Sequence, residues 1–464
     1  MMMEIGVVVV VVAIVVVVVL MVMKNVNWWL YESKLGEKQY SLPPGDMGWP
    51  FIGNMWSFLR AFKSSDPDSF LSAFVSRFGK TGMYKALMFG NPSVIVTTPE
   101  TCKRVLTDDE KFKPGWPRST IELVGKKSFI SMAYEEHKRL RRLTSSSING
   151  MEALSLYLTY IEKNVISSLE KWTKMGQIEF LTEIRKLTFK IIMHIFLSNE
   201  SEPIMEALER EYTALNYGIR AMKINIPGFA YHKAFKARKN LLSVFQSIVD
   251  ERRKLRKEYS PMKAKDMMDS LLDAEDDNGR KLSDEEIIDV MLMYLNAGHE
   301  SSGHITMWAT YFLQKHPEYF QKAKEEQEEI IRRRPSTQKG LTLKEIRQMD
   351  FLYKVIDETM RVITFSLVVF REAKSDVVMN GKEEEERVLI TLYGIWMNTQ
   401  VTPFQKVGKL LCGSDQFILI LRYILIQRNL IPTDGIIMNI RLENSFPLEE
   451  EVDSVLGMIL LRWK

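Results

Sequence analysis

An uncharged apolar run at the N-terminus constrains this chain more than any other feature. The nineteen residues from Ile5 to Met23 carry no charge, are mostly valine and are bounded by Glu4 and Lys24. At about 1.5 Å per residue, a helix of this length crosses a hydrocarbon core of about 30 Å. Every backbone polar group must be paired inside lipid, and a helix is the only single segment that achieves this. We therefore expect residues 1–24 to form a transmembrane anchor.

Aromatic and basic residues follow the run, as they do at a membrane interface. Because positive charge is retained on the cytosolic side, we expect the body of the chain to face the cytosol, with residues 25–45 as an interfacial linker. The alternative is a cleaved signal peptide. It is weaker because the run is long, its basic residues come after it and no small-residue cleavage site appears. The interfacial residues are Trp28, Trp29 and Tyr31, with Lys24, Lys34 and Lys38.

Composition excludes several classes of protein. The chain has 464 residues, 46% of them apolar, so it can bury a large core. A net charge of +4 over this length indicates no nucleic-acid partner. Two cysteines, Cys102 and Cys412, exclude a disulfide scaffold and a four-cysteine zinc site, which suits a reducing compartment.

The body of the chain reads as mainly α with small β-sheets. A proline hinge at 41–46 forces an extended path and then a turn. The segments 83–89 and 93–97 alternate like the strands of a hairpin. Capping boxes at 283–286 and 342–345 each predict the start of a helix, the first of them long and apolar. The charged stretch between Lys254 and Asp284 predicts a solvated linker or loop.

The segment from Ala297 to Ser302, inside that long helix, is the leading candidate for chemistry. It holds Gly298, Glu300 and two serines, and glycine and serine each weaken a helix interior by several tenths to about 1 kcal/mol. A kinked core helix is the structural alternative. His299 and His304 are five residues apart and lie well apart around a helix, so a zinc-protease site is discounted.

Three further sets of charged residues could have either a functional or a purely structural role. His137 and Arg141 share one helical face and could hold an anion, or form an ordinary basic surface. Glu358 and Arg361 lie one turn apart and could be a solvated ion pair. Arg371 sits in an apolar strand-like segment, where its charge needs a partner.

Taken in order, the proline hinge and these four constellations resemble the haem-thiolate monooxygenases, the cytochromes P-450, in their membrane-anchored microsomal form. The resemblance runs from about Leu42 to Gly381 and implies a truncated cytochrome P-450 fold behind the anchor, on the endoplasmic reticulum membrane. The amino-acid sequences of four segments are similar to those of a plant branch of the family that acts in gibberellin biosynthesis. These segments are 112–117, 225–232, 295–304 and 362–367.

The resemblance implies a reaction and a role for each candidate residue. In the family a cysteine thiolate holds haem iron and a partner NADPH-cytochrome reductase supplies two electrons from NADPH. Glu300 and Ser301 would relay protons, with serine standing in place of the usual threonine. The implied substrate is an apolar tetracyclic diterpenoid acid. His137, where many members carry tryptophan, would bind haem propionates with Arg141 and Arg371, while Glu358 and Arg361 would be structural.

The resemblance stops after Gly381, before the family's cysteine loop. Residues 382–387 are a charge run, and Cys412 lacks the phenylalanine, arginine and second glycine of that loop, so we do not expect it to ligate iron. We divide the chain into an anchor (1–24), a linker (25–45), a partial monooxygenase domain (46–381) and an aberrant tail (382–464).

The genetic code accounts for the tail. If each codon's third base is read with the first two of the next codon, residues 447–464 can encode the missing loop, Phe-Gly-Gly-Gly-Ser-Arg-Leu-Cys-Pro-Gly, and the start of its helix. Two downstream positions are forced: the pair at 458–459 requires Asp and the pair at 463–464 requires Glu. Read in the same shifted frame, residues 419–435 can encode the segment that precedes the cysteine loop in the family.

We therefore hypothesise that the tail is a retained intron followed by out-of-frame coding sequence, and that the chain as written is inactive. Two alternatives remain. One is a non-catalytic membrane-anchored protein, and the other is a related oxidase that acts on triterpenoids.

Overall fold

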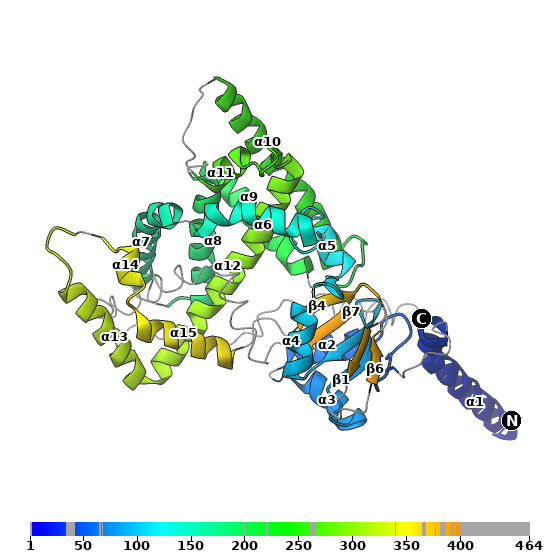
Figure 1. Ribbon diagram of the computed structural model, residues 1–464. Helices are drawn as coiled ribbons and strands as arrows, with labels where there is room; N and C mark the ends of the chain where they lie inside the picture. Colours follow the sequence, from blue (N-terminus) through cyan, green and yellow to red (C-terminus); the bar gives the residue numbers. More distant parts are fainter. Residues whose placement is uncertain are drawn as a thin grey trace. The chain divides into compact units, whose positions relative to one another are not determined.

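The computed structural model describes residues 2–398 with internal gaps, and it divides into two units (Figure 1). Unit 1 comprises residues up to Pro117 together with the segment from Ser366 to Val401, and unit 2 begins at Arg118 and runs to Phe365. The described range omits 34–41, 65, 67, 133, 150, 176, 199–200, 220, 259–265, 339, 364–367, 376, 381–386 and 391–393.

Unit 1 contains the N-terminal helices and the sheets. Its helical elements are α1 (Met2–Asn27), the π-helical turn η1 (Trp28–Glu32), α2 (Met55–Lys63), α3 (Ser69–Phe78) and α4 (Pro99–Thr107). Its strands are β1 (Met83–Met88), β2 (Asn91–Val96), β3 (Phe112–Pro114), β4 (Val368–Ala373), β5 (Val377–Asn380), β6 (Arg387–Ile390) and β7 (Gly394–Asn398).

The strands of unit 1 form a five-stranded sheet in the order β1-β2-β7-β4-β3 and a two-stranded sheet of β5 and β6. The predicted hairpin of β1 and β2 is confirmed as an antiparallel pair, with Met88 opposite Asn91. The second strand begins at Asn91 rather than Ser93, so the connecting turn is shorter than predicted. Buried side chains of β1, β2, β3 and α4 meet β4 and β5 in one core, which includes Val94, Cys102, Val105, Phe112 and Ala373.

Helix α1 contains the apolar run that the sequence predicts as an anchor and continues past it to Asn27. Among the described residues, the stretch Ile14–Glu32 is long and apolar enough to cross a membrane by length and composition, and almost none of it is buried. A core helix of this length would instead bury most of its side chains.

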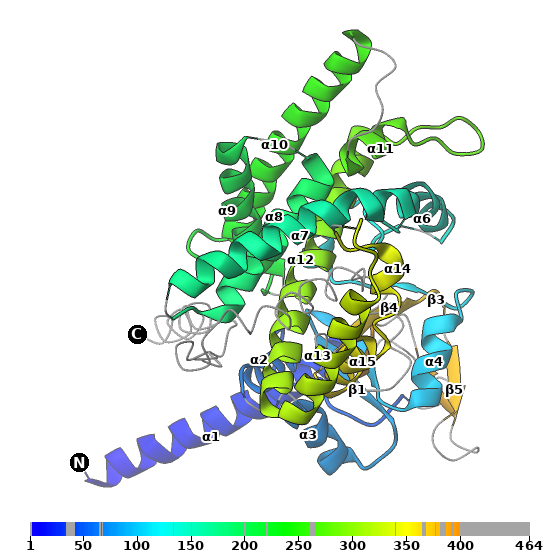
Figure 2. The same ribbon diagram turned by 90° about the vertical axis from the view of Figure 1, so that its left-hand side faces the viewer.

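Unit 2 is helical in its described part. Its helices are α5 (Arg118–Val124), α6 (Tyr134–Asn149), α7 (Met151–Lys174), α8 (Phe180–Leu197), α9 (Glu202–Ile219), α10 (Ala230–Glu258), α11 (Met267–Asp273), α12 (Asp284–Lys315), α13 (Pro317–Arg332), α14 (Leu343–Ile346) and α15 (Asp350–Val362). They enclose one large apolar core. In Figure 2, α12 runs through this bundle, and it packs against α8 and α15.

Both predicted capping boxes are confirmed. The Ser283 hydroxyl accepts from the backbone N–H of Glu286, whose carboxylate accepts from the N–H of Ser283. The same reciprocal pair joins Thr342 and Glu345. The second box opens only the one-turn helix α14, and the longer α15 starts separately at Asp350.

The predicted solvated linker between Lys254 and Asp284 is wrong in part. Helix α10 continues to Glu258, and α11 buries Met267, Met268, Leu271 and Leu272. Several acidic residues of this stretch pair with arginines of the neighbouring helices. Arg252 of α10 donates to Asp266 and Asp269, which keeps the short helix against α10.

The predicted tail lies largely outside the described residues, including most of its charge run, Cys412 and the out-of-frame cysteine position. Two of its segments are described, as β6 and β7. Strand β7 pairs with β4 and β2, and β6 pairs with β5, so the described sheets continue past Gly381.

Candidate functional site

The candidate segment of α12 is shaped by its contact with α8. A methyl group added at Gly298 would lie 3.2 Å from Cδ1 of Ile192, and one added at Gly303 would lie 3.3 Å from Cγ of Arg185. Glycine at these two positions therefore lets the helices approach closely. The hydroxyls of Ser301 and Ser302 each donate to the carbonyl four residues earlier, and α12 runs through this segment without a break.

Glu300 is a buried carboxylate in a cationic setting. The Arg185 guanidinium donates to its Oε1, while His304 Nδ1 lies 3.8 Å from its Oε2. Burial by itself raises the pKa of the Glu300 carboxyl. The adjacent His299 and the Arg185 charge outweigh this effect and lower the pKa to about 2. The carboxylate is therefore ionised at neutral pH and can accept hydrogen bonds.

His299 is held in one orientation beside this carboxylate. Its Nε2 lies 2.9 Å from the Arg185 carbonyl oxygen, and since a carbonyl only accepts, Nε2 carries the hydrogen. Its Nδ1 then faces Glu300 Oε1 at 3.4 Å. The edges of Phe189 and Tyr212 pack against the ring. Two helices thus build a polar cluster inside an apolar core.

Ser301 follows Glu300 on the same turn and is half-buried. Its hydroxyl hydrogen is directed to the Ala297 carbonyl. Glu300 and Ser301, the two groups that the sequence predicts for proton transfer, thus follow each other on α12 but bond to different partners. Their role in proton transfer stays a prediction.

Helix α6 carries the predicted cations His137 and Arg141. The His137 ring meets Phe129 edge-on with ring centroids 5.5 Å apart, and Phe129 also meets Tyr294 of α12. Tyr294 in turn hydrogen-bonds Thr144 at 2.8 Å, which connects α6 to α12.

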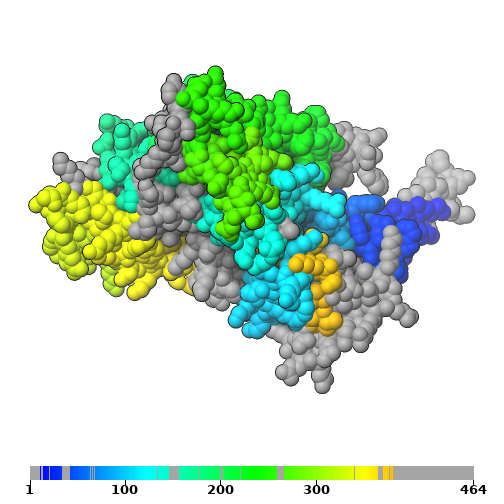
Figure 3. Space-filling model, turned by 45° about the horizontal axis from the view of Figure 1, so that its top comes forward, coloured from blue at the N-terminus to red at the C-terminus, as the bar shows by residue number. Residues whose placement is uncertain are grey.

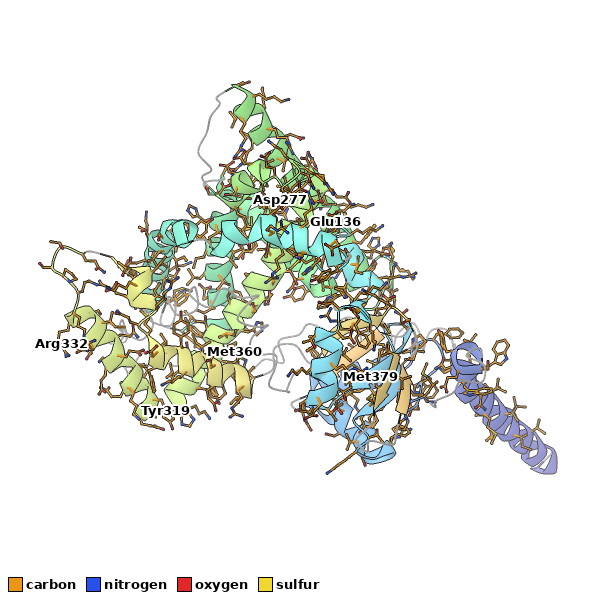
Figure 4. The ribbon with its side chains drawn as sticks, in the orientation of Figure 1. Glu136, Asp277, Tyr319, Arg332, Met360 and Met379 are labelled. Atoms are coloured by element: carbon orange, nitrogen blue, oxygen red, sulfur yellow. The ribbon has the colours of Figure 1, made fainter. Side chains whose placement is uncertain are left out.

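The neighbouring arginines of α6 have a different role. Arg139 pairs with Asp276 at 2.8 Å and with Glu286 at 3.1 Å, and Arg142 pairs with Asp277. Figure 4 labels Glu136 and Asp277 at this junction. These pairs connect α6 to the turn before α12, so the two arginines are structural.

Arg371 lies on β4 in unit 1, and the structure does not place it relative to His137 and Arg141 in unit 2. Its guanidinium donates to the Leu106 carbonyl at 2.9 Å, and Asp109 is 4.0 Å away. Burial lowers its pKa. A propionate-binding role for these three residues stays a prediction.

Glu358 and Arg361 form the predicted pair at the end of α15. Two hydrogen bonds of 2.8 and 2.6 Å join them, and both side chains are exposed. The Arg361 guanidinium lowers the pKa of Glu358. The family's structural role for this pair also stays a prediction.

Among the described residues, none fits the thiolate ligand of haem. Cys102 is fully buried on α4, where its Sγ lies 3.6 Å from the Val96 carbonyl oxygen. Burial raises the pKa of its thiol to about 12, which opposes the thiolate form. Cys102 is therefore a core residue.

Sequence reasoning missed Arg185 and did not assign His299 to Glu300. Arg185 lies among Ile184, Leu187 and other buried residues of α8, and a guanidinium in so apolar a helix is a signal for a buried partner. The partner itself could not be identified from sequence, because 115 positions separate the two side chains.

Comparison with known proteins bears on this arrangement. The sequence profile of the family described as Cytochrome P450 matches residues 43–403. The chain is 68% identical over 360 residues to Ent-kaurenoic acid oxidase 1 of Arabidopsis thaliana, which covers 78% of this chain and 74% of that protein. It is 52% identical over 382 residues to a 7,8-epoxymelianol synthase of Ailanthus altissima, covering 82% and 77% of the two chains.

Among solved structures, the chain resembles a retinoic acid-bound cyanobacterial protein, CYP120A1, with a TM-score of 0.69 and 23% identity. The match covers 85% of this chain and 92% of that one. At this identity the likeness concerns the fold, and it agrees with the predicted class of a mainly helical protein with small sheets.

Proposed function

Because the chain belongs to the cytochrome P450 family of monooxygenases, we propose that it is an ent-kaurenoic acid oxidase by descent. Relatives of that name from Arabidopsis thaliana are 68% and 63% identical to it. The structural observation that best supports an oxidase is the buried, ionised Glu300 of α12, which is paired with Arg185 and followed in sequence by Ser301. The substrate is then an apolar tetracyclic diterpenoid acid, oxidised in successive steps toward the first gibberellin.

Haem, when bound, supplies the oxygen activation in this family, with electrons from NADPH through a reductase. Haem in this family needs a thiolate ligand, and the buried Cys102 does not provide one. The proposed part of its own residues is limited to proton transfer. Arg185 keeps Glu300 ionised and oriented, and Ser301 is the neighbouring alcohol, whose hydroxyl donates to the Ala297 carbonyl in this structure.

We propose further that residues from about 382 onward descend from a retained intron and a shifted reading frame, and that the chain as written lacks oxidase activity. The out-of-frame reading of 447–464 supports this, because it admits the family's cysteine loop, including a cysteine at 454–455. The ordered strands β6 and β7 are compatible with it, since backbone pairing requires little of a particular sequence.

Two forms of the full-length protein test these proposals. One is the chain as written, and the other carries the frame-corrected C-terminal region. We expect only the corrected form to show the thiolate-type Soret band after reduction and carbon monoxide binding, and only that form to oxidise ent-kaurenoic acid with a reductase and NADPH. A thiolate-type band from the chain as written would overturn the proposed inactivity.

The second candidate function differs only in substrate. The similarity to a 7,8-epoxymelianol synthase favours testing a triterpenoid. Conversion of a triterpenoid but not of ent-kaurenoic acid by the corrected form would replace the first proposal. Failure of the corrected form to bind haem would instead favour a non-catalytic membrane-anchored protein.

We also propose that α1 anchors the protein in the endoplasmic reticulum membrane, with the body in the cytosol and a cytosolic reductase domain as its partner. The exposed apolar surface of α1 supports this, because such a surface is stable only in lipid or against another protein.

A further inference from the structure

The carboxylate of Glu122 is held by donors from another part of unit 2. Glu122 lies on α5, and its Oε1 accepts from Lys223 Nζ at 2.5 Å while its Oε2 accepts from the Tyr231 hydroxyl at 2.6 Å. Lys223 belongs to the connection between α9 and α10, and Tyr231 lies in the first turn of α10. An ammonium group and a phenol from one short stretch of the chain therefore bind both oxygens of one carboxylate.

The charge of this cluster suits a carboxylate. Burial by itself raises the pKa of the Glu122 carboxyl, but hydrogen bonds from Lys223 and Tyr231 and the charge of Lys126 outweigh this effect and lower it. Burial and the Glu122 carboxylate raise the pKa of the Tyr231 phenol, so the phenol keeps its proton and donates. Without the Glu122 charge, the cluster holds two ammonium groups and one phenol, a composition that binds an anion.

Tyr231 is fixed independently of Glu122. Its side chain is 1% exposed, and its ring stacks on Phe235 one helical turn along, with ring centroids 6.5 Å apart. The side chains of Lys223 and Glu122 are by contrast 49% and 31% exposed. Solvent thus reaches the ammonium group and the carboxylate, whereas the phenol keeps its place. A site with one rigid donor and one accessible donor can accept a carboxylate from outside.

Helix α5 does not depend on Glu122 for its position. Arg238 of α10 donates to the last two carbonyl oxygens of α5 at 3.0 Å each, and the Thr120 hydroxyl donates to the Ile219 carbonyl at 3.3 Å. Helix α5 packs against α9 and α10, and in the space-filling view its cyan lies against the green of α10 (Figure 3). The Glu122 side chain can therefore turn away while the backbone of α5 stays in place.

We propose that Lys223 and Tyr231 form the binding site for the carboxylate of the substrate, and that Glu122 occupies this site when no substrate is bound. An incoming apolar acid displaces Glu122, so that one carboxylate replaces another at the same two donors. The connection that carries Lys223 also exposes the apolar side chain of Ile226, as a site for an amphipathic ligand requires. This inference rests on the proposed function, because the proposed substrate is an apolar acid.

Ligand affinities of full-length variants test the inference. Equilibrium dialysis in lipid nanodiscs, with empty nanodiscs as the blank, measures the binding of ent-kaurenoic acid and of its neutral methyl ester to the chain as written and to the frame-corrected form. The ester keeps the apolar body and removes the charge, so the ratio of the two affinities isolates recognition of the carboxylate. The variants are Lys223→Met, Tyr231→Phe and Glu122→Gln. Lys236→Met is the control, because Lys236 is an exposed lysine of α10 outside the cluster.

We expect Lys223→Met to weaken binding of the acid about tenfold and binding of the ester less than about twofold. Tyr231→Phe should weaken binding of the acid alone, by about threefold to tenfold. Glu122→Gln should instead strengthen binding of the acid about threefold or more, because removal of an internal competitor raises the population of the open site. Lys236→Met should leave both affinities unchanged.

The opposite responses of Lys223 and Glu122 distinguish a ligand site from a structural contact. If these residues only held α5 in place, all three substitutions would weaken the acid and the ester alike, and that result would overturn the inference. Palmitate is the third ligand. A Lys223 effect on palmitate without one on the diterpenoid acid would show that the site takes another carboxylate and would also overturn it. A parent that binds neither the acid nor the ester in either form would overturn the proposed function itself.

Discussion

The guanidinium of Arg185 on α8 donates to the carboxylate of Glu300 on α12, across the interface that two glycines of α12 keep close. Both partners are largely buried, with exposed side-chain fractions of 23% and 10%. The pair therefore couples the packing of two core helices to the ionisation of the proposed proton-transfer acid.

Arg185→Leu should destabilise the protein by about 3–5 kcal/mol, because removal of one member of a buried pair leaves the other charge uncompensated. The neighbouring Lys186 provides the control. It pairs with Glu183 but is 57% exposed, so Lys186→Leu should cost less than about 1 kcal/mol. Urea unfolding of the full chain in detergent measures both free energies. Similar losses in the two variants would contradict a buried role for Arg185.

The Glu300 carboxyl should make stability depend on acid pH. Its pKa is lowered from 4.5 to about 2 in the folded state, so the folded form binds fewer protons than the unfolded form below pH 4.5. The corresponding stabilisation, about 3 kcal/mol at one pKa unit per ~1.4 kcal/mol, is present above that pH and is lost as pH falls toward 2.

The measurement compares the free energy of unfolding of the parent and Glu300→Gln between pH 2 and pH 6. Other carboxylates contribute equally to both proteins, so the difference isolates Glu300. We expect this difference to shrink as pH falls. A difference independent of pH would show that the carboxylate is not held ionised.

Gly125→Ala should break a second buried pair. Gly125 has a φ of +138°, and an added methyl carbon would lie 2.3 Å from Cγ of Asp289. Asp289 pairs with Arg238 and accepts from the N–H of Lys127 at 2.9 Å. We expect a loss of about 3–5 kcal/mol by thermal or urea unfolding.

Gly279→Ala is the control for the backbone alone. Gly279 has a φ of +74°, but nothing lies within 4 Å of an added methyl carbon there. The substitution should cost about 1–2 kcal/mol from the left-handed conformation. A cost at Gly125 no larger than this would indicate that Asp289 moves aside without penalty.

Ser283→Ala should remove the cap of α12. The hydroxyl accepts from the N–H of Glu286, and its loss should cost about 0.5–2 kcal/mol. Ser247→Ala on the exposed face of α10 is the matched control, because that hydroxyl donates only to a carbonyl of its own helix. The control should change the unfolding free energy by less than about 0.5 kcal/mol. An equal effect would argue against the cap.

Local patterns predicted the helices better than their partners. Ser283 and Glu286 are three residues apart, and the capping box depends only on this spacing, so it was predictable. The charged stretch before Asp284 was misread, because Asp266 bonds to Arg252 of α10 and the stretch contains the largely buried helix α11. Charge shows that a residue needs a partner or water, and it does not show which.

The candidate site was predictable only where it depends on local residue order. Glu300 and Ser301 are adjacent in sequence, so their position on one turn of a helix follows from that order. Arg185 and Asn27 were not identified, because their partners lie 115 and 20 or more positions away. Only the folded chain brings such groups within hydrogen-bonding distance.

The sequence by itself determined the apolar helix, the resemblance to an oxidase family and the absence of that family's cysteine loop, because each is a matter of residue order within a short segment. Tertiary structure decided that Glu300 is ionised, that Cys102 is an inert core thiol and that the Asn27 side chain bonds to the backbone between Met47 and Phe51. These properties depend on burial and on distances between segments far apart along the chain, which local residue order does not specify.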